Sequence, residues 1–345
     1  MQHGEKKKES QSETMQSSVQ EKEQDIDIGN DHETENILER KATFSDTNPN
    51  SETIMALSSL DLDGAPCLAS GSDATTIKLW NLHTNTLITA LEDHTQVVTA
   101  LTTFSRQDVL FLASGSEDKS IKLWDLEKTC LDATLIGHSA AVRALQTFST
   151  HGALYLASAS DDQTIVLWNL ANNKPLATLE GHSQEVCALT TYRHYDIPCL
   201  ASGSKDKTIK LWNVGTNTFI TTLEGHYDHV NAVTAFQSEG MENLASGSND
   251  LTVKLWNLNT NNLIVTLSVG SPVYALASFE SDKIACLGCG DADGKITLWN
   301  IVKQGLIATL EGDGSPLYAL TTFEQDGVVG LASGRSDGKI ELWME

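Results

Sequence analysis

The sequence has few basic residues and no long apolar run. Its 345 residues include 23 Lys and Arg against 46 Asp and Glu, a formal net charge of −23 at pH 7. Binding to nucleic acid or anionic lipid depends on a basic surface, so this balance argues against both partners. No apolar stretch approaches the roughly 18 residues that cross a bilayer, and residues 1–14 lack the apolar core of a secretory signal. We therefore expect a soluble, cytoplasmic protein.

Cysteine is also scarce, and its placement indicates neither disulfides nor a metal centre. The six cysteines show no paired framework, and several fall inside apolar strand patterns, which favours buried free thiols. Cys286 and Cys289 form a lone C-x-x-C pair without a nearby His, whereas zinc usually needs four ligands. Phosphate-binding and dinucleotide-binding glycine motifs are absent. We expect neither a metal nor a cofactor.

Tryptophan, in contrast, marks an internal repeat. All seven tryptophans follow patterns such as TIKLW and SIKLW, at spacings of 44, 44, 44, 44, 43 and 44 residues. They are Trp80, Trp124, Trp168, Trp212, Trp256, Trp299 and Trp343. A fixed period of this length is typical of repeat architectures.

One period reads as four β-strands. Between residues 97 and 137 the runs are VVTALTTF, LFLASGS, SIKLWDL and CLDATLIG. Each has strand length and β-branched residues, with turn residues between the runs. No window shows sustained 3.6-residue apolar periodicity, so we expect no helices in the repeats.

Such a four-stranded sheet has two apolar faces and cannot bury both alone. Packing each sheet against the next buries them, and closing the series into a ring removes the exposed end faces. The sequence therefore predicts an all-β fold: a single seven-bladed β-propeller with four antiparallel strands per blade.

The two ends of the repeat series are complementary. The last repeat stops at residue 345 after three strands, while residues 37–44, ILERKATF, resemble a fourth strand. We predict that this segment completes the last blade and closes the ring; the alternative is an unstructured segment. Residues 1–36 are polar and predict a disordered tail, which leaves 37–345 as the propeller.

A polar pattern recurs in four of the repeats. A His precedes the first strand, a Ser follows 20 residues later, an Asp four residues after that, and the Trp six further on. The four sets are His94, Ser114, Asp118, Trp124; His138, Ser158, Asp162, Trp168; His182, Ser202, Asp206, Trp212; and His226, Ser246, Asp250, Trp256. A Trp–Ser–His–Asp chain would satisfy each buried polar group. A hydrolase triad uses the same residue types, but a catalytic set is not expected four times in one chain.

These motifs resemble the WD-repeat family of β-propellers, in the GH dipeptides, the LASGS-x-D-K-[ST]-I-K-LW runs and the period. The resemblance covers residues 37–345. It implies a scaffold for multiprotein complexes, without catalytic activity, in which the four sets above are fold-stabilising tetrads. The first repeat has Ala74 at the turn Asp position, the sixth has VGS and Cys289, and the seventh has Gly312-Asp313. We expect these three blades to be less rigid.

A partner site is predicted around the upper opening of the channel. Alanine recurs on each first strand, but neighbouring positions vary between repeats. In the family these variable positions surround the opening and commonly hold peptides. The predicted contact residues are Arg143, Glu185, Lys205, His229, Asn231, Tyr274 and Tyr318. The tyrosines would anchor a peptide or loop, and the charged residues, with Glu117 and Asp161, would meet opposite charges. The alternative is an ordinary solvated rim.

We therefore expect a protein–protein interaction scaffold that is a monomer on its own and not an enzyme. The other function considered is a substrate receptor of a ubiquitin-ligase-type complex, as some relatives are. No F-box-like helical pattern precedes the repeats, and an unrepeated carboxylate or His cluster, which a propeller enzyme would need, is absent from the sequence.

Overall fold

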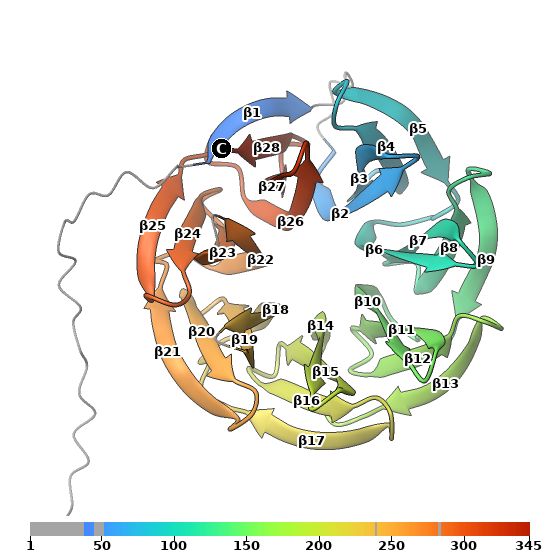
Figure 1. Ribbon diagram of the computed structural model, residues 1–345. Coiled ribbons are helices and arrows are strands. Elements are labelled where there is room, and N and C mark those ends of the chain that lie inside the picture. Colours follow the sequence, from blue (N-terminus) through green and yellow to red (C-terminus); the bar gives the residue numbers. More distant parts are fainter. Residues whose placement is uncertain (1–37, 45–51, 239, 282–283) are drawn as a thin grey trace, which may run out of the picture. The chain divides into compact units, whose positions relative to one another are not determined.

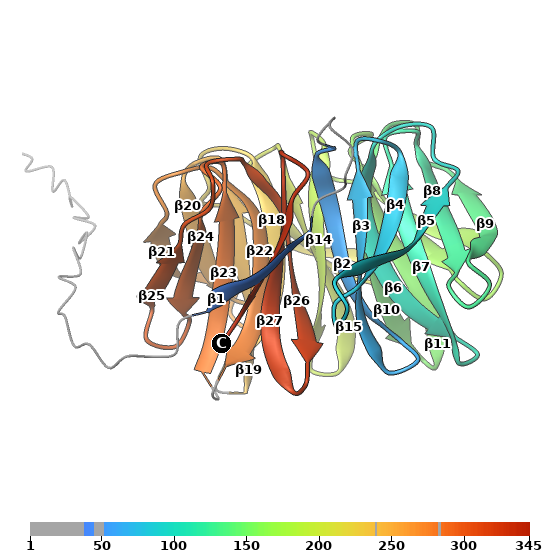
Figure 2. The same ribbon diagram turned by 90° about the horizontal axis from the view of Figure 1, so that it is seen from above.

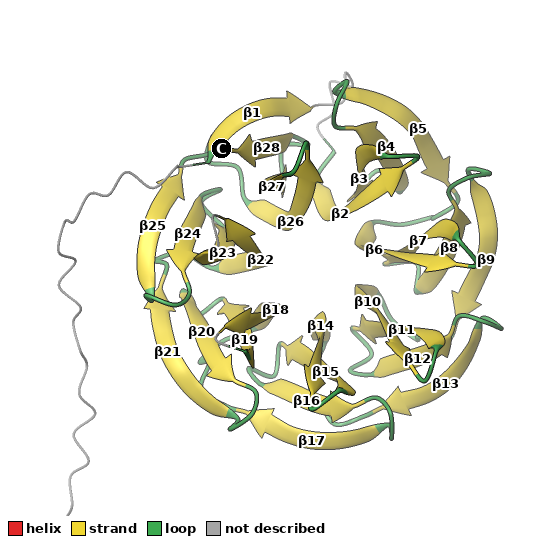
Figure 3. Cartoon of the chain, viewed as in Figure 1, coloured by secondary structure: helices red, strands yellow, loops and turns green. Residues whose placement is uncertain are grey.

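Four-stranded antiparallel sheets follow one another around a central axis (Figure 1). The computed structural model describes residues 38–44, 52–238, 240–281 and 284–345. These residues fall within one compact unit, 36–345. They form seven sheets, each with four strands, so the predicted seven-bladed β-propeller is confirmed. The described residues contain strands and loops but no helix, and therefore no helix able to span a membrane (Figure 3).

Blades one to six have their strands in chain order from the axis outwards, whereas blade seven takes its outermost strand from the N-terminal part of the chain. The innermost strands are β2 (Ile54–Leu62), β6 (Val98–Arg106), β10 (Val142–Thr150), β14 (Val186–His194), β18 (Val230–Ser238), β22 (Val273–Ser281) and β26 (Leu317–Gln325). The second strands are β3 (Ala65–Ser72), β7 (Val109–Ser116), β11 (Ala153–Ser160), β15 (Ile197–Ser204), β19 (Met241–Ser248), β23 (Ile284–Asp291) and β27 (Val328–Arg335). The third strands are β4 (Thr76–Asn81), β8 (Ser120–Asp125), β12 (Ile165–Asn169), β16 (Ile209–Asn213), β20 (Thr252–Asn257), β24 (Ile296–Asn300) and β28 (Ile340–Met344). The outermost strands are β5 (Thr86–Glu92), β9 (Cys130–Ile136), β13 (Lys174–Leu179), β17 (Thr218–Leu223), β21 (Asn262–Ser268), β25 (Gly305–Leu310) and, for blade seven, β1 (Glu39–Phe44).

The core lies between neighbouring blades. Trp212 of blade four packs in one apolar cluster with Leu167 and Leu179 of blade three. The other tryptophans likewise contact the preceding blade, and Trp80 of blade one meets Phe323 of blade seven. Because each indole fills a gap in the blade before it, a blade isolated from its neighbours would expose that surface.

The ring closes through strands from opposite ends of the chain. β1 pairs antiparallel with β28, from Glu39 opposite Met344 to Phe44 opposite Ile340, and a register shift falls between Arg40 and Ala42. The predicted closing strand is thus confirmed, with bounds Glu39–Phe44 inside the predicted 37–44. The side view shows β1 running along the outside of β28 and β27 (Figure 2). The predicted tail, residues 1–36, lies outside the described residues.

Candidate functional site

The four His, Ser, Asp and Trp sets are brought together as hydrogen-bonded chains. In blade four, Trp212 Nε1 donates to Ser202 Oγ at 2.9 Å, and His182 lies 2.7 Å from both Ser202 Oγ and Asp206 Oδ2. An indole can only donate, so Ser202 Oγ accepts a hydrogen bond from Trp212. A carboxylate can only accept, so the ring nitrogen facing Asp206 carries the hydrogen, and the other ring nitrogen accepts a hydrogen bond from the Ser202 hydroxyl. In blades two, three and five the same three contacts measure 2.7 to 2.8 Å.

Each chain ties the loop before the innermost strand to the turn between the second and third strands. The Asp206 carboxylate also accepts the backbone N–H of Ser183 at 3.0 Å and the hydroxyl of Thr208 at 2.6 Å. Ser202 is 0% exposed and His182 is 7% exposed. Because the hydroxyl is sealed and already engaged on both sides, this geometry suits a structural contact and leaves a substrate no access.

In the hydrogen-bonded chain of blade two, the charge lies on Asp118 rather than on His94. Burial opposes ionisation of Asp118, but hydrogen bonds from Ser120, His94 and the Thr95 N–H outweigh it, so its pKa falls to about 2. Burial lowers the pKa of His94, although Asp118 favours its protonated form. At neutral pH the folded state therefore pairs a neutral imidazole with a carboxylate.

These pKa shifts predict that the free energy of unfolding decreases as the pH falls. The lowered pKa of Asp118 stabilises the fold above the unfolded value near 4, and this contribution is lost as pH falls towards 2. The lowered pKa of His94 acts in the same direction below about pH 6.5. We expect urea unfolding at pH 7, 5 and 3 to show a progressive loss of stability, roughly 1 kcal/mol of it from Asp118 by pH 3. The difference in stability between the wild type and Asp118→Asn should therefore shrink between pH 4 and 2; a constant difference would contradict this assignment.

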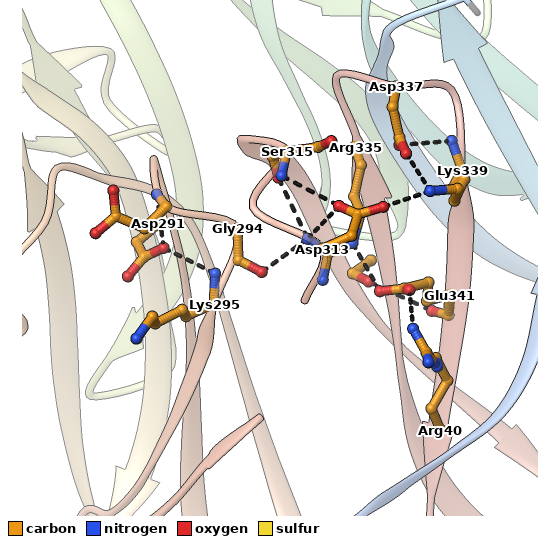
Figure 4. Close-up of polar contacts among 12 residues, drawn as sticks. Arg40, Asp291, Gly294, Lys295, Asp313, Ser315, Arg335, Asp337, Lys339 and Glu341 are labelled. Carbon is orange, nitrogen blue, oxygen red and sulfur yellow. Dashed lines mark hydrogen bonds and ion pairs between the residues drawn. The ribbon is translucent and has the colours of Figure 1, made fainter. Parts of the chain in front are cut away.

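Blade seven has a different polar core, built around a buried guanidinium (Figure 4). By register, Arg335 occupies the position of Ser204, and Glu341 that of Lys210. Arg335 is 0% and Glu341 1% exposed. Arg335 Nε donates to Glu341 Oε2 at 2.6 Å, and Nη1 donates to Gly294 O of blade six at 2.7 Å. Arg335 thus connects blade seven to blade six. Neither of these two blades has a complete tetrad.

The same carboxylate reaches the closing strand. Arg40 on β1 donates from Nη1 to Glu341 Oε1 at 2.7 Å, so Glu341 lies between two guanidinium groups. Nearby, Lys339 bridges Asp313 and Asp337, and its hydrogen bond lowers the pKa of Asp313. A Cβ on Gly312 would collide with the Arg335 guanidinium, so a glycine is required there. The sequence prediction missed this network, although SGR and ELW depart visibly from the repeated SGS and KLW.

The tyrosines of the predicted partner site lie together. Tyr274 of blade six and Tyr318 of blade seven stack with ring centroids 5.4 Å apart and planes at 21°. Each is half-buried and follows, two residues later, a half-buried proline, Pro272 or Pro316. Among the described residues the two phenolic hydroxyls have no hydrogen-bond partner. This sector of the opening therefore offers two aromatic rings and two hydroxyls that can donate hydrogen bonds to a partner.

The charged residues of the site are paired with one another. Arg143 Nε and Nη2 contact the Asp161 carboxylate at 2.6 to 3.0 Å, and Nη1 donates to Glu117 at 2.9 Å. These hydrogen bonds, Asp161 first, raise the pKa of Arg143. Lys205 Nζ lies 3.3 Å from Glu185. In the structure these charges already pair with one another, so a partner would meet ion pairs rather than isolated charges, and their predicted contact with a partner stays a prediction.

The two remaining predicted residues belong to blade five. Asn231 Nδ2 donates to Asn249 Oδ1 at 2.8 Å and to Val273 O at 2.9 Å, joining blade five to blade six. His229 is half-buried, with Nδ1 3.5 Å from Asn249 Nδ2. The sequence-predicted contact residues thus divide into a charged sector, a hydrogen-bonded asparagine and a stacked tyrosine pair.

Four consecutive segments match the family described as "WD domain, G-beta repeat", at residues 85–125, 129–169, 173–213 and 217–257. The chain belongs to the WD-repeat family. Each matched segment contains one complete tetrad. It begins with the outermost strand of one blade and continues through the three inner strands of the next, so the four WD repeats are offset by one strand from blades two to five. Comparison with curated proteins found no significant match.

Blades one, six and seven depart from the tetrad pattern but keep the strands of the fold. In these WD-repeat blades the strands and their order are retained, but Trp299 Nε1 donates to Thr297 Oγ1 at 3.2 Å instead of to a serine. Cys289 occupies the serine position, is fully buried, and has a pKa raised by burial. Within the described residues no group of three or more His, Cys, Asp or Glu is arranged to hold a metal.

Proposed function

We propose that this WD-repeat protein is a non-catalytic scaffold that binds a peptide or loop of another protein at the upper opening of its channel. The observation that carries the proposal is the stacked pair of Tyr274 and Tyr318. Tyrosine buries a large area at low entropic cost and offers a hydroxyl for hydrogen bonding, which suits an interface anchor. The neutralised charges of the opposite sector would fix orientation more than supply binding energy.

Two features of the site support a binding role over catalysis. The tetrad serines are buried, and each accepts a hydrogen bond from tryptophan, which withdraws them from nucleophilic chemistry. Arg143 and Lys205 are held in ion pairs, as positioned recognition groups are. An upper opening lined in this way can select a partner through its shape and a few polar contacts.

Removing the tyrosines should remove partner binding. We expect Tyr274→Ala combined with Tyr318→Ala to weaken partner affinity at least about 30-fold, because truncation of an interface hot spot costs about 2 kcal/mol or more. Affinity purification with mass spectrometry would identify the partner, and calorimetry would measure its affinity for both forms.

The matched control is Tyr227→Ala, which removes a tyrosine that is 83% exposed on the loop before β18. It should retain partners at wild-type levels. Partners captured equally by wild type and the double variant would show that the tyrosine pair is not the docking site. Recovery of ligase subunits with every variant would instead favour the ubiquitin-ligase receptor.

A further inference from the structure

A separate pocket opens at the bottom face, among the lower ends of the innermost strands of blades three, four and five. It has a volume of about 430 Å³, and Phe148, Tyr192 and Phe236 line it, one from each blade. Binding pockets commonly hold several hundred Å³ and combine aromatic walls with a few polar groups. This pocket lies at the opposite end of the innermost strands from Tyr274 and Tyr318.

The rim carries charge that the fold has not neutralised. Arg193 lines the pocket, is exposed, and donates from Nη1 to Asp196 O at 3.1 Å. Within the described parts of the chain no carboxylate lies within ion-pair distance of this guanidinium. On the other wall, Glu242 accepts a hydrogen bond from Gln237 at 2.7 Å. Arg193 therefore differs from Arg143, which is held by two carboxylates.

Apolar surface continues from the pocket onto the adjoining turns. Tyr195 is 81%, Ile197 43% and Met241 39% exposed, and these residues flank the lining residues of blades four and five in sequence. Because they adjoin the lining residues along the chain, a bound segment longer than the pocket would meet them. Exposed apolar residues beside a pocket indicate a protein contact.

A second bottom pocket lacks this combination. The pocket between blades seven and one has a similar volume, about 450 Å³, but its rim carries Asp61, Glu324 and Asp326, and none of its lining residues is basic. In a chain of net charge −23, an unpaired cation beside aromatic rings is a distinctive recognition feature.

We propose that the pocket of blades three to five binds an extended peptide segment of another protein, with a large apolar side chain against Phe148, Tyr192 and Phe236 and a carboxylate on Arg193. A guanidinium binds a carboxylate with two parallel hydrogen bonds, which sets both affinity and direction. The exposed turn residues would cover the segment beyond the pocket. This site is independent of the top-face site, so one protein could hold two partners at opposite ends of the ring.

A random 12-residue peptide library displayed on phage and selected on the full chain tests the proposal. The expected peptides share an aromatic or large aliphatic residue within two positions of Asp or Glu. A synthetic peptide of that pattern should bind at least tenfold more weakly to Arg193→Glu, which reverses the charge, and to Ser149→Trp, which fills the pocket from an exposed position. Its affinity for the Tyr274→Ala, Tyr318→Ala form should stay within twofold of wild type, which separates this site from the top-face site.

Other outcomes would overturn the proposal. They are the absence of a shared acidic–apolar pattern, or affinity unchanged in both pocket variants. Concentration-dependent dimers that Arg193→Glu abolishes would assign the surface to a second copy of this chain. Thermal melting of each variant within a few degrees of wild type establishes that the fold is intact.

Discussion

Glu341→Lys is expected to lower the free energy of unfolding by about 3–5 kcal/mol, the loss typical of breaking a buried ion pair. The Glu341 carboxylate is 1% exposed and accepts hydrogen bonds from Arg335 and Arg40. A lysine there would bury a third positive charge beside two guanidinium groups. Since Arg40 lies on the closing strand, the variant should also release β1. Urea unfolding measures the first effect, and limited proteolysis between β1 and β2 the second.

The other blades supply a matched rescue. Blades one, two, four and five place serine at the Arg335 position and lysine at the Glu341 position, as with Ser204 and Lys210. The double variant Arg335→Ser, Glu341→Lys should therefore recover at least half of the lost stability. A double variant no more stable than Glu341→Lys alone would show that the two residues are not energetically coupled.

The repeat carries most of the architectural information. Because the tryptophan recurs at one position, its period predicts the number of blades, and the runs between tryptophans predict the strands. The incomplete last repeat, together with ILERKATF, predicts the pairing of β1 with β28. Each of these inferences depends on a local pattern that every blade repeats, and the ring follows because the sheets must bury both faces.

The site was less predictable, because its chemistry depends on contacts between repeats. Arg143 reaches Glu117 of the preceding blade, and Arg335 reaches Gly294 O across a blade boundary. A sequence pattern gives the residue type at each position but not the direction of a long side chain. For this reason the sequence predicts neither the ion pairs of Arg143 nor the network of Arg335.

Trp212→Ala is expected to destabilise the protein by about 3–5 kcal/mol, as large-to-small substitutions of buried aromatics do. Trp212 is 2% exposed, packs against blade three and donates the hydrogen bond that occupies Ser202. Its removal opens a cavity between two blades and leaves a buried hydroxyl with one partner fewer. The midpoint of urea unfolding, with an unchanged slope, would report this loss.

Trp299→Ala is the comparison at a tryptophan that occupies the same position in a blade without a tetrad. Trp299 is half-buried, contacts Thr297 in place of a serine, and has no tetrad His in its blade. Its removal should cost at least about 1 kcal/mol less than removal of Trp212, because less area and no buried network are lost. Equal losses would mean that packing between blades, without the His–Ser–Asp chain, sets the stability of the ring. A larger loss at Trp212 is the result expected from its deeper burial together with its hydrogen-bonded network.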